Sequence, residues 1–272
     1  MDKEWDGRPD PELLLRQNFP EGESDGKGKL KIFFGYAAGV GKTYAMLDAA
    51  RQEKEAGRDV VAGYIEPHDR PDTMALLDGL EFLPPRTVGY KGIVLREFDL
   101  DAALIRRPDL ILVDELAHTN AQGSRHRKRC QDVTELLDAG INVYTTVNVQ
   151  HLESLHDIVA SITHVRVSER IPDSVFDNAS QVELVDIAPE ELRQRLEEGK
   201  IYHKNQADKA KISFFTLENL SALREIALRR TADRVNREVI RERDAAGKEY
   251  FTNEHVLVCL SPSPTNARVI RT

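Results

Sequence analysis

The chain has 272 residues, of which 40% are hydrophobic and 31% are charged, so it is long enough for about two domains with a buried core. Its 38 lysines and arginines against 46 aspartates and glutamates give a formal net charge of -8, which disfavours a nonspecific duplex-DNA binder. The aliphatic runs are far shorter than the roughly 18 residues that span a bilayer, and the charged start does not resemble a secretion signal. We therefore expect a cytoplasmic segment without direct nucleic-acid or membrane contact.

The first 28 residues are polar and rich in turn-forming residues, and we expect them to form a flexible arm. From residue 29 onward, short apolar runs alternate with segments of helical periodicity. The predicted strands are residues 30–34, 60–65, 110–113 and 141–147, and the clearest predicted helices are residues 42–57 and 128–139. Because strands that alternate with helices form βαβ units, the pattern predicts an α/β fold with a doubly wound, mainly parallel sheet.

The later part of the chain is less regular. It holds a possible edge strand at residues 182–187, a helix at 189–198, and a long helix at about 216–243 with Leu220, Leu223, Ala227 and Arg230 on one stripe. We assign residues 29–247 to the first domain. A further strand is predicted at residues 255–260, but one strand cannot form a core, so residues 253–272 are predicted to begin a truncated second α/β domain.

A glycine-rich loop from Gly35 to Thr43 joins the first predicted strand to the first predicted helix. It is similar to the phosphate-binding P-loop G-x-x-x-x-G-K-[ST], except that Tyr36 stands at the first glycine position and Gly35 comes one place early. Glycines let backbone N–H groups approach phosphate oxygens, a lysine can bridge the β- and γ-phosphates, and a threonine hydroxyl can ligate Mg²⁺. The loop therefore predicts a P-loop NTPase-like domain that binds ATP and Mg²⁺ through Gly39, Val40, Gly41, Lys42, Thr43 and Tyr44. The alternative is a strand-to-helix turn with a surface lysine.

Two carboxylates, Asp114 and Glu115, end the aliphatic strand at residues 110–113. Ligands of open α/β sheets bind at the carboxyl ends of the strands. We therefore predict that Asp114 holds Mg²⁺ through water, together with Thr43, and that Glu115 orients an attacking water. The alternative is a strand that ends in a polar turn.

Further polar residues follow these motifs. Thr146 or Asn148 could sense the γ-phosphate, or they could only cap a helix that starts near residue 150. The basic cluster at residues 125–129 enters a helix, and Arg125 is predicted to meet the γ-phosphate or a neighbouring subunit's nucleotide, with a solvated loop as the alternative. His118 is either a structural hydrogen-bonding residue or a phosphate sensor. The candidate catalytic residues are Lys42, Glu115 and Arg125, and Asp114 and Asn148 complete the predicted nucleotide site.

Several blocks of the sequence resemble the N-terminal cytoplasmic domain of the KdpD-type potassium- and osmosensitive sensor histidine kinases. The blocks are residues 29–35, 38–47, 114–120, 123–126 and 145–155, and residues 224–234 are similar to the helix that ends this domain. The likeness covers about residues 28–236. That family shares the shifted Gly35, whereas Arg127 stands where the family has proline. Residues 255–263 look like the opening of the universal-stress-protein-like domain that follows in the family.

The resemblance implies an ATP-binding regulatory domain of a two-component sensor kinase that controls potassium-transport genes. Such a domain modulates the balance between kinase and phosphatase activity of a transmitter, in cis or in trans, and acts indirectly on a response regulator. It would be the cytoplasmic portion of an inner-membrane sensor, and a homo-oligomer is among the arrangements it allows. The chain has none of the motifs of the transmitter itself, so we expect slow ATP hydrolysis at most.

Two other functions use the same loop. A small-molecule or nucleoside kinase would need an acceptor pocket and an arginine-bearing lid, and the only comparable arginine cluster is at residues 125–129. The P-loop ATPases that move DNA or proteins are disfavoured, because Ala37 occupies the place of their signature lysine. Regulation by bound ATP is the favoured hypothesis.

Overall fold

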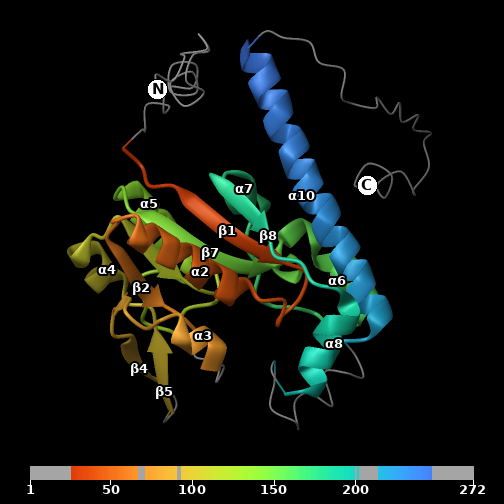
Figure 1. The fold of residues 1–272 in the computed structure, drawn as a ribbon, viewed down its shortest axis with the longest axis horizontal. Helices are drawn as coiled ribbons and strands as arrows, with labels where there is room; N and C mark the ends of the chain where they lie inside the picture. The colour runs from red at the N-terminus through yellow and green to blue at the C-terminus, as the bar shows by residue number, and fades with distance from the viewer. Residues whose placement is uncertain (1–25, 67–70, 91–92, 200, 202–213, 247–272) are drawn as a thin grey trace, which may run out of the picture. The chain divides into compact units, whose positions relative to one another are not determined.

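A computed structural model describes residues 26–66, 71–90, 93–199, 201 and 214–246 (Figure 1). The chain divides into two compact units, Met1–Ala232 and Asp233–Thr272, and the central sheet lies in the first. Most of the predicted arm and all of the predicted strand at residues 255–260 lie outside the described residues. No helix in the described part of the chain is both long and apolar enough to cross a membrane.

A six-stranded sheet with order β3-β2-β6-β7-β1-β8 forms the centre of the unit, and every pair of neighbouring strands is parallel (Figure 1). The mainly parallel α/β fold is thus confirmed. Its strands are β1 (Leu30–Gly35), β2 (Val60–Tyr64), β3 (Glu81–Phe82), β6 (Leu110–Val113), β7 (Asn142–Asn148) and β8 (Gln181–Leu184). Strand β7 lies between β1 and β6, so the loop after β1 and the carboxylates after β6 are separated by one strand at the same edge of the sheet.

Helices cover both faces of this sheet. On one face, Met46, Leu47 and Ala50 of α2 (Lys42–Glu55) pack in a cluster with Phe33 of β1, whereas the neighbouring Ile32 belongs to the other face. The other helices are α3 (Pro71–Ala75), α4 (Leu100–Arg106), α5 (Arg129–Asp138), α6 (His156–Thr163), α7 (Asp173–Asp177), α8 (Pro189–Glu197) and α10 (Leu217–Ala246). Because residues i and i+1 of a strand point to opposite faces, an almost wholly apolar β1 serves both cores.

The first part of α10 belongs to the same unit. The predicted stripe is confirmed, since Leu220, Leu223, Ala227 and Arg230 are all buried. Arg230 donates a 2.7 Å hydrogen bond to Asp177 of α7, and its guanidinium lies over the ring of Phe176. Lone arginines are costly to bury, so this acidic and aromatic partnership explains why an arginine can continue an apolar stripe.

Several elements were not predicted. A separate antiparallel pair, β4 (Arg86–Tyr90) and β5 (Ile93–Glu97), follows β3, and α4 comes directly after it. The helix expected near residue 150 is instead two short 3₁₀ turns, Val149–His151 and Glu153–Leu155, before α6 begins. These elements are short, so they bury too few residues to show a clear apolar period.

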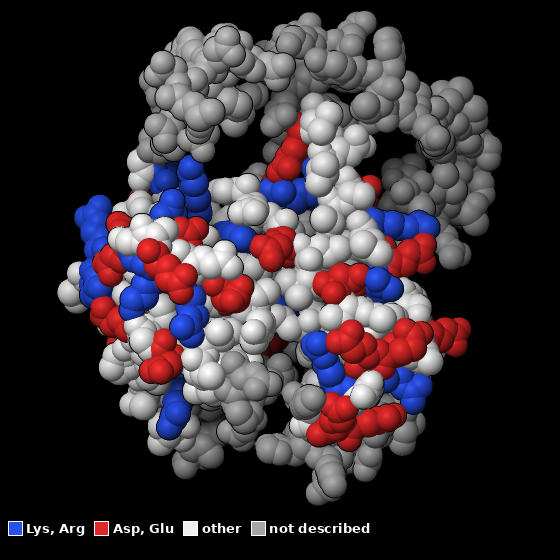
Figure 2. All heavy atoms as spheres, viewed as in Figure 1, with Lys and Arg blue, Asp and Glu red and all other residues white. Residues whose placement is uncertain are grey.

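Charged side chains are mixed on the face seen in Figure 2, where acidic and basic groups lie next to each other. On α8, for example, Arg195 pairs with Glu191 and Arg193 pairs with Glu197. Exposed pairs of this kind contribute at most about 1 kcal/mol to stability. The unit is therefore held together mainly by its two apolar clusters.

Candidate functional site

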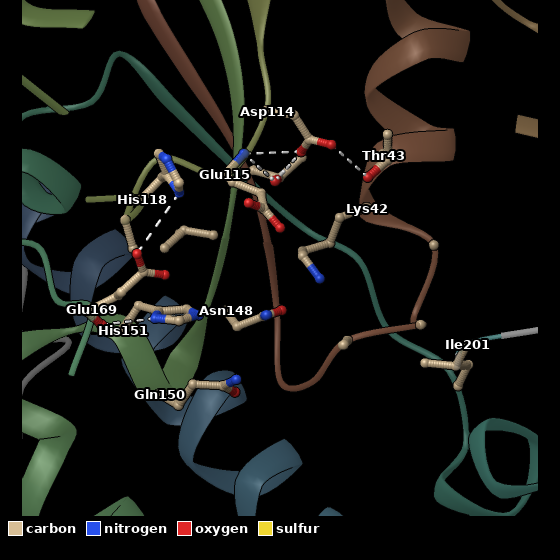
Figure 3. Close-up of a pocket in the computed structure, with 16 residues that line it drawn as sticks. Lys42, Thr43, Asp114, Glu115, His118, Asn148, Gln150, His151, Glu169 and Ile201 are labelled. Atoms are coloured by element: carbon tan, nitrogen blue, oxygen red, sulfur yellow. Dashed lines mark hydrogen bonds and ion pairs between the residues drawn. The ribbon is translucent and has the colours of Figure 1, made fainter. Parts of the chain in front are cut away.

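A pocket of about 290 Å³ lies at the carboxyl edge of the parallel sheet (Figure 3). It is bounded by the loop after β1, by the ends of β6 and β7, and by Glu169 and Ile201 from later segments. The lining residues are Ala38, Gly39, Gly41, Lys42, Thr43, Asp114, Glu115, Ala117, His118, Thr146, Val147, Asn148, Gln150, His151, Glu169 and Ile201. This is the edge at which open α/β sheets bind their ligands.

The loop after β1 requires glycine at two positions for different reasons. Gly39 has a φ of +90°, and a Cβ there would lie 2.3 Å from Cδ1 of Ile201. Gly35 has ordinary φ, but a Cβ would lie 2.6 Å from Cγ2 of Val40. Tyr36, at the first glycine position of the general template, is fully buried, and its hydroxyl donates to the carbonyl of Ile187. The close approach that needs glycine therefore occurs one residue early, at Gly35.

Helix α2 begins where this loop ends, and its first two residues enter the pocket (Figure 3). Gly41, the residue before the helix, has a φ of +107° and no side chain that could cap the backbone N–H groups of the first turn. The Lys42 side chain is only 8% exposed, and its Nζ donates to the carbonyl of Ala37 across the loop. An uncapped helix start with an inward-facing lysine is suited to an anion.

The carboxylate of Asp114, which follows β6, accepts hydrogen bonds from Thr43, Thr146 and the backbone of Glu115. Its Oδ2 accepts a 3.2 Å hydrogen bond from the Thr43 hydroxyl. Its Oδ1 accepts from the Thr146 hydroxyl and from the backbone N–H of Glu115. The carboxylate is almost completely buried. Thr43 and Asp114, which lie 71 residues apart in sequence, are thus brought together as predicted.

Glu115 turns into the pocket from a left-handed backbone conformation with a φ of +56°. Glu115 is exposed as a residue, and its carboxylate opens into the pocket, whose protein walls desolvate it in part. This desolvation, reinforced by the negative charge of Asp114, raises the pKa of Glu115 to about 7. The group is therefore divided between its acid and carboxylate forms near neutral pH.

The wall opposite the loop is made of amide and imidazole groups. Asn148 and Gln150 each have a side-chain oxygen that is buried and that no described residue donates to. Nδ1 of His151 lies 2.8 Å from the carbonyl oxygen of Glu169, and burial lowers the pKa of this histidine. Asn148 was predicted from sequence. Gln150 and His151 could have been found because they follow it directly, whereas nothing in the sequence indicates Glu169.

His118 also lines the pocket and connects it to a second layer. Its Nε2 lies 3.2 Å from both carboxylate oxygens of Glu97, and its Nδ1 lies 3.8 Å from Glu169. The histidine is thus engaged in structural contacts while it faces the cavity, and both interpretations made from the sequence stay open.

Three predicted site residues are not in the pocket. The guanidinium of Arg125 forms ion pairs with Asp101 and Glu135, because these carboxylates flank its loop on α4 and α5. Val40 packs in the hydrophobic core, and Tyr44 is 48% exposed outside the pocket. The structure therefore does not place Arg125 in the pocket of its own chain, and contact with a neighbouring subunit's nucleotide stays a prediction.

The fold and the pocket place this unit in one class, the parallel α/β domains with a ligand pocket beside a glycine-rich loop. It has a parallel sheet, a glycine-rich loop before α2, and a pocket at the carboxyl edge where that loop meets the carboxylates after β6. The chain belongs to the family described as "KdpD: Osmosensitive K+ channel His kinase sensor domain", whose model matches residues 26–235. The resemblance noted in the sequence is thereby confirmed.

Curated relatives carry the same family name. The chain is 60% identical over 267 residues to a protein named Sensor protein KdpD from Clostridium acetobutylicum, and 52% identical over 266 residues to the protein of that name from Escherichia coli K12. These matches cover 97% of this chain but only 30% and 29% of the two relatives. A Putative sensor protein KdpD from Synechocystis is 47% identical over 245 residues, which are 90% of this chain and 66% of that protein.

Proposed function

We propose that the pocket binds ATP with Mg²⁺ and that the domain is the nucleotide-binding regulatory part of a KdpD-type sensor kinase. One observation carries the proposal: the Thr43 hydroxyl lies 3.2 Å from the Asp114 carboxylate in a pocket that the glycine loop and Lys42 also line. These groups come from the start of α2 and the end of β6. This is the division of roles in a P-loop nucleotide site.

The chemistry of the lining residues fits such a ligand. The hydroxyl of Thr43 and the carboxylate of Asp114 are hard oxygen donors and would hold Mg²⁺, directly or through water. Lys42 and the backbone N–H groups at the start of α2 would bind the phosphates. Mg²⁺, when bound, would offset the negative charge of the triphosphate.

Two further groups are positioned to act on the terminal phosphate or on water next to it. The Glu115 carboxylate faces the pocket, and we assign it the role of orienting a water molecule. Asn148 lines the pocket, and the NH₂ group of its side-chain amide can donate to an oxygen of the γ-phosphate. With a pKa of about 7, Glu115 is present partly as the carboxylate near neutral pH, the form that can accept a proton from water.

The names of the relatives indicate the kind of protein in which this domain acts. Their printed names call them sensor proteins, and the family model refers to a K+ channel His kinase sensor domain. We infer that ATP occupancy here modulates a transmitter kinase, in cis or in trans, and through it a response regulator of potassium-transport genes. A small-molecule or nucleoside kinase is the alternative, but Arg125 and Arg129 do not supply the arginine lid that it needs, because Arg125 is paired outside the pocket and Arg129 is buried.

Calorimetric titration with ATP and Mg²⁺ tests this proposal. Lys42→Ala removes a charged phosphate ligand and should weaken binding by roughly 10- to 100-fold. Lys54→Ala is the matched control, because Lys54 lies on the same helix outside the pocket and should leave the affinity unchanged. Equal affinities for wild type and Lys42→Ala would contradict the nucleotide site. ADP release that appears only with an added acceptor would favour the kinase instead.

A further inference from the structure

Arg129, the first residue of α5, is completely buried behind the pocket. Its Nη1 donates a 3.1 Å hydrogen bond to the backbone carbonyl of Asp114, and its Nη2 lies 3.3 Å from the carboxylate of Glu97. The Cζ atom of the guanidinium lies 4.1 Å from the ring centroid of Tyr64. A buried arginine is rare, and this one is directed at the peptide that joins the two carboxylates of the site.

Glu97 comes from the end of β5, which is not part of the main sheet. It is 4% exposed and also accepts hydrogen bonds from the backbone N–H of Ala121 and from His118. Burial alone would raise the pKa of Glu97, yet these hydrogen bonds and the positive charge of Arg129 hold it below its usual value. The two residues therefore form a buried pair of opposite charges.

The peptide between Asp114 and Glu115 needs such support. A left-handed conformation costs a residue other than glycine about 1–2 kcal/mol, so neighbouring groups must hold Glu115 at its φ of +56°. The carbonyl side of the peptide is held by Arg129. The N–H side donates to Oδ1 of Asp114 and to the hydroxyl of Thr146. Both polar ends of one peptide unit are thus fixed, and the carbonyl end depends on the buried pair.

We propose that Arg129, oriented by Glu97, is a positioning residue for the metal-nucleotide site. By holding the carbonyl of Asp114, it keeps the Asp114 carboxylate on Thr43 and the Glu115 carboxylate in the pocket. The inference rests on the proposed function. It assigns a role to a different arginine of the basic cluster from the one that the sequence indicated.

A purely structural role would look different. A buried ion pair is weak evidence for stability, because replacing both partners by uncharged residues of similar volume is often neutral. The double variant Arg129→Met with Glu97→Gln leaves no unpaired charge, and the glutamine can still accept from Ala121. It should therefore fold while it removes the donor to Asp114. Arg129→Lys, which keeps the charge and one possible donor, serves as the conservative variant.

The test measures ATP affinity by calorimetry, with Mg²⁺ and with EDTA, for these variants and for wild type. We expect the double variant to keep its affinity in EDTA but to lose roughly 10- to 100-fold of the gain that Mg²⁺ gives wild type, as is typical when support of a metal ligand is removed. Arg129→Lys should recover part of that gain. The exposed pair on α10 offers the control variant Arg229→Met with Glu225→Gln, which should behave as wild type. A folded double variant with the full Mg²⁺ gain would overturn the proposal.

Hydrogen–deuterium exchange gives a readout that does not depend on nucleotide. The amide of Glu115 should exchange at least about tenfold faster in the double variant, because its peptide is released at the carbonyl end. Faster exchange confined to β4 and β5 would mean that the pair only fastens this hairpin, and would overturn the positioning role. Failure of wild type to bind ATP would instead contradict the proposed function, and exchange at Glu115 would then decide on Arg129 by itself.

Discussion

The two walls of the pocket are built in different ways. The loop wall comes from one stretch of chain, residues 35–43, and depends on backbone geometry and glycine. The carboxylate wall, formed by Asp114 and Glu115 after β6, is held by Thr146 of β7 and, behind the pocket, by Arg129 of α5, which pairs with Glu97 of β5. The loop wall can therefore be recognised in the sequence. Which residues support the carboxylate wall, and how they lie, depends on tertiary packing.

The largest effect should come from the carboxylate wall. Arg129→Ala leaves Glu97 buried without its charged partner, and should lower the free energy of unfolding by about 3–5 kcal/mol. Arg229→Ala removes a mostly exposed ion pair on α10 and should cost less than about 1 kcal/mol. Urea denaturation of both variants measures the difference. Similar costs for the two arginines would mean that the buried network contributes no special stability.

Added side-chain volume in the loop wall should lower the free energy of unfolding. Gly39→Ala brings a Cβ to 2.3 Å from Cδ1 of Ile201 at a positive φ, whereas Gly57→Ala has a similar φ of +89° and nothing within 4 Å. Both should lose about 1 kcal/mol for the left-handed backbone. The clash should cost Gly39→Ala roughly 1–3 kcal/mol more. Equal unfolding free energies would show that the loop has room for a side chain.

The charge of Glu115 should give the free protein a characteristic pH dependence. The folded-state pKa of about 7 lies above the usual value of 4.5, so the folded state holds the proton more tightly than the unfolded state does. This contribution to stability is present below about pH 4.5 and is lost as the pH rises through 7, and it is small because solvent reaches the side chain. Glu115→Gln should lack this fall when unfolding is followed in EDTA without nucleotide. Parallel curves for the variant and wild type would contradict the raised pKa.

His151 should give a smaller effect of opposite sign. Burial lowers its pKa below the usual 6.5, so the unfolded state binds the proton more readily. Stability from this group is complete above about pH 6.5 and falls as the pH drops towards the folded-state pKa. His151→Gln should flatten the acid side of the stability curve, measured as the midpoint of urea unfolding between pH 5 and 7. A variant that keeps the full acid dependence would place the titrating group elsewhere.

The extent to which the fold could be predicted follows from the lengths of its elements. Strands β1, β2, β6 and β7 were located within about one residue at each end, because β2 and β6 are buried throughout and β1 and β7 are buried at most of their positions. The hairpin of β4 and β5 was missed. Its strands have only five residues each, RTVGY and IVLRE, and mix apolar with charged residues, which is too short a pattern for a clear period. The short helices α4, α6 and α7 were missed for the same lack of a sustained period.

The site was predictable where contiguous motifs define it. Gly39, Gly41, Lys42, Thr43, Asp114, Glu115 and Asn148 all line one pocket, as their places after three parallel strands indicated. Among the basic residues the prediction chose Arg125, which pairs with Asp101 and Glu135, and overlooked Arg129 four positions later. Both arginines look alike in sequence. Which one reaches the site depends on the direction in which α5 enters the fold.

The sequence by itself determined the parallel α/β architecture, the glycine loop and the family, because these depend on apolar periodicity and on motifs that are continuous in the chain. Only the tertiary structure decided that Tyr36 is buried and that Glu169 completes the pocket wall. It also decided that Arg129 and Glu97 meet behind Asp114. The reason is physical: a buried charge needs its partner within hydrogen-bonding distance, and partners 32 residues apart meet only when packing has placed their elements.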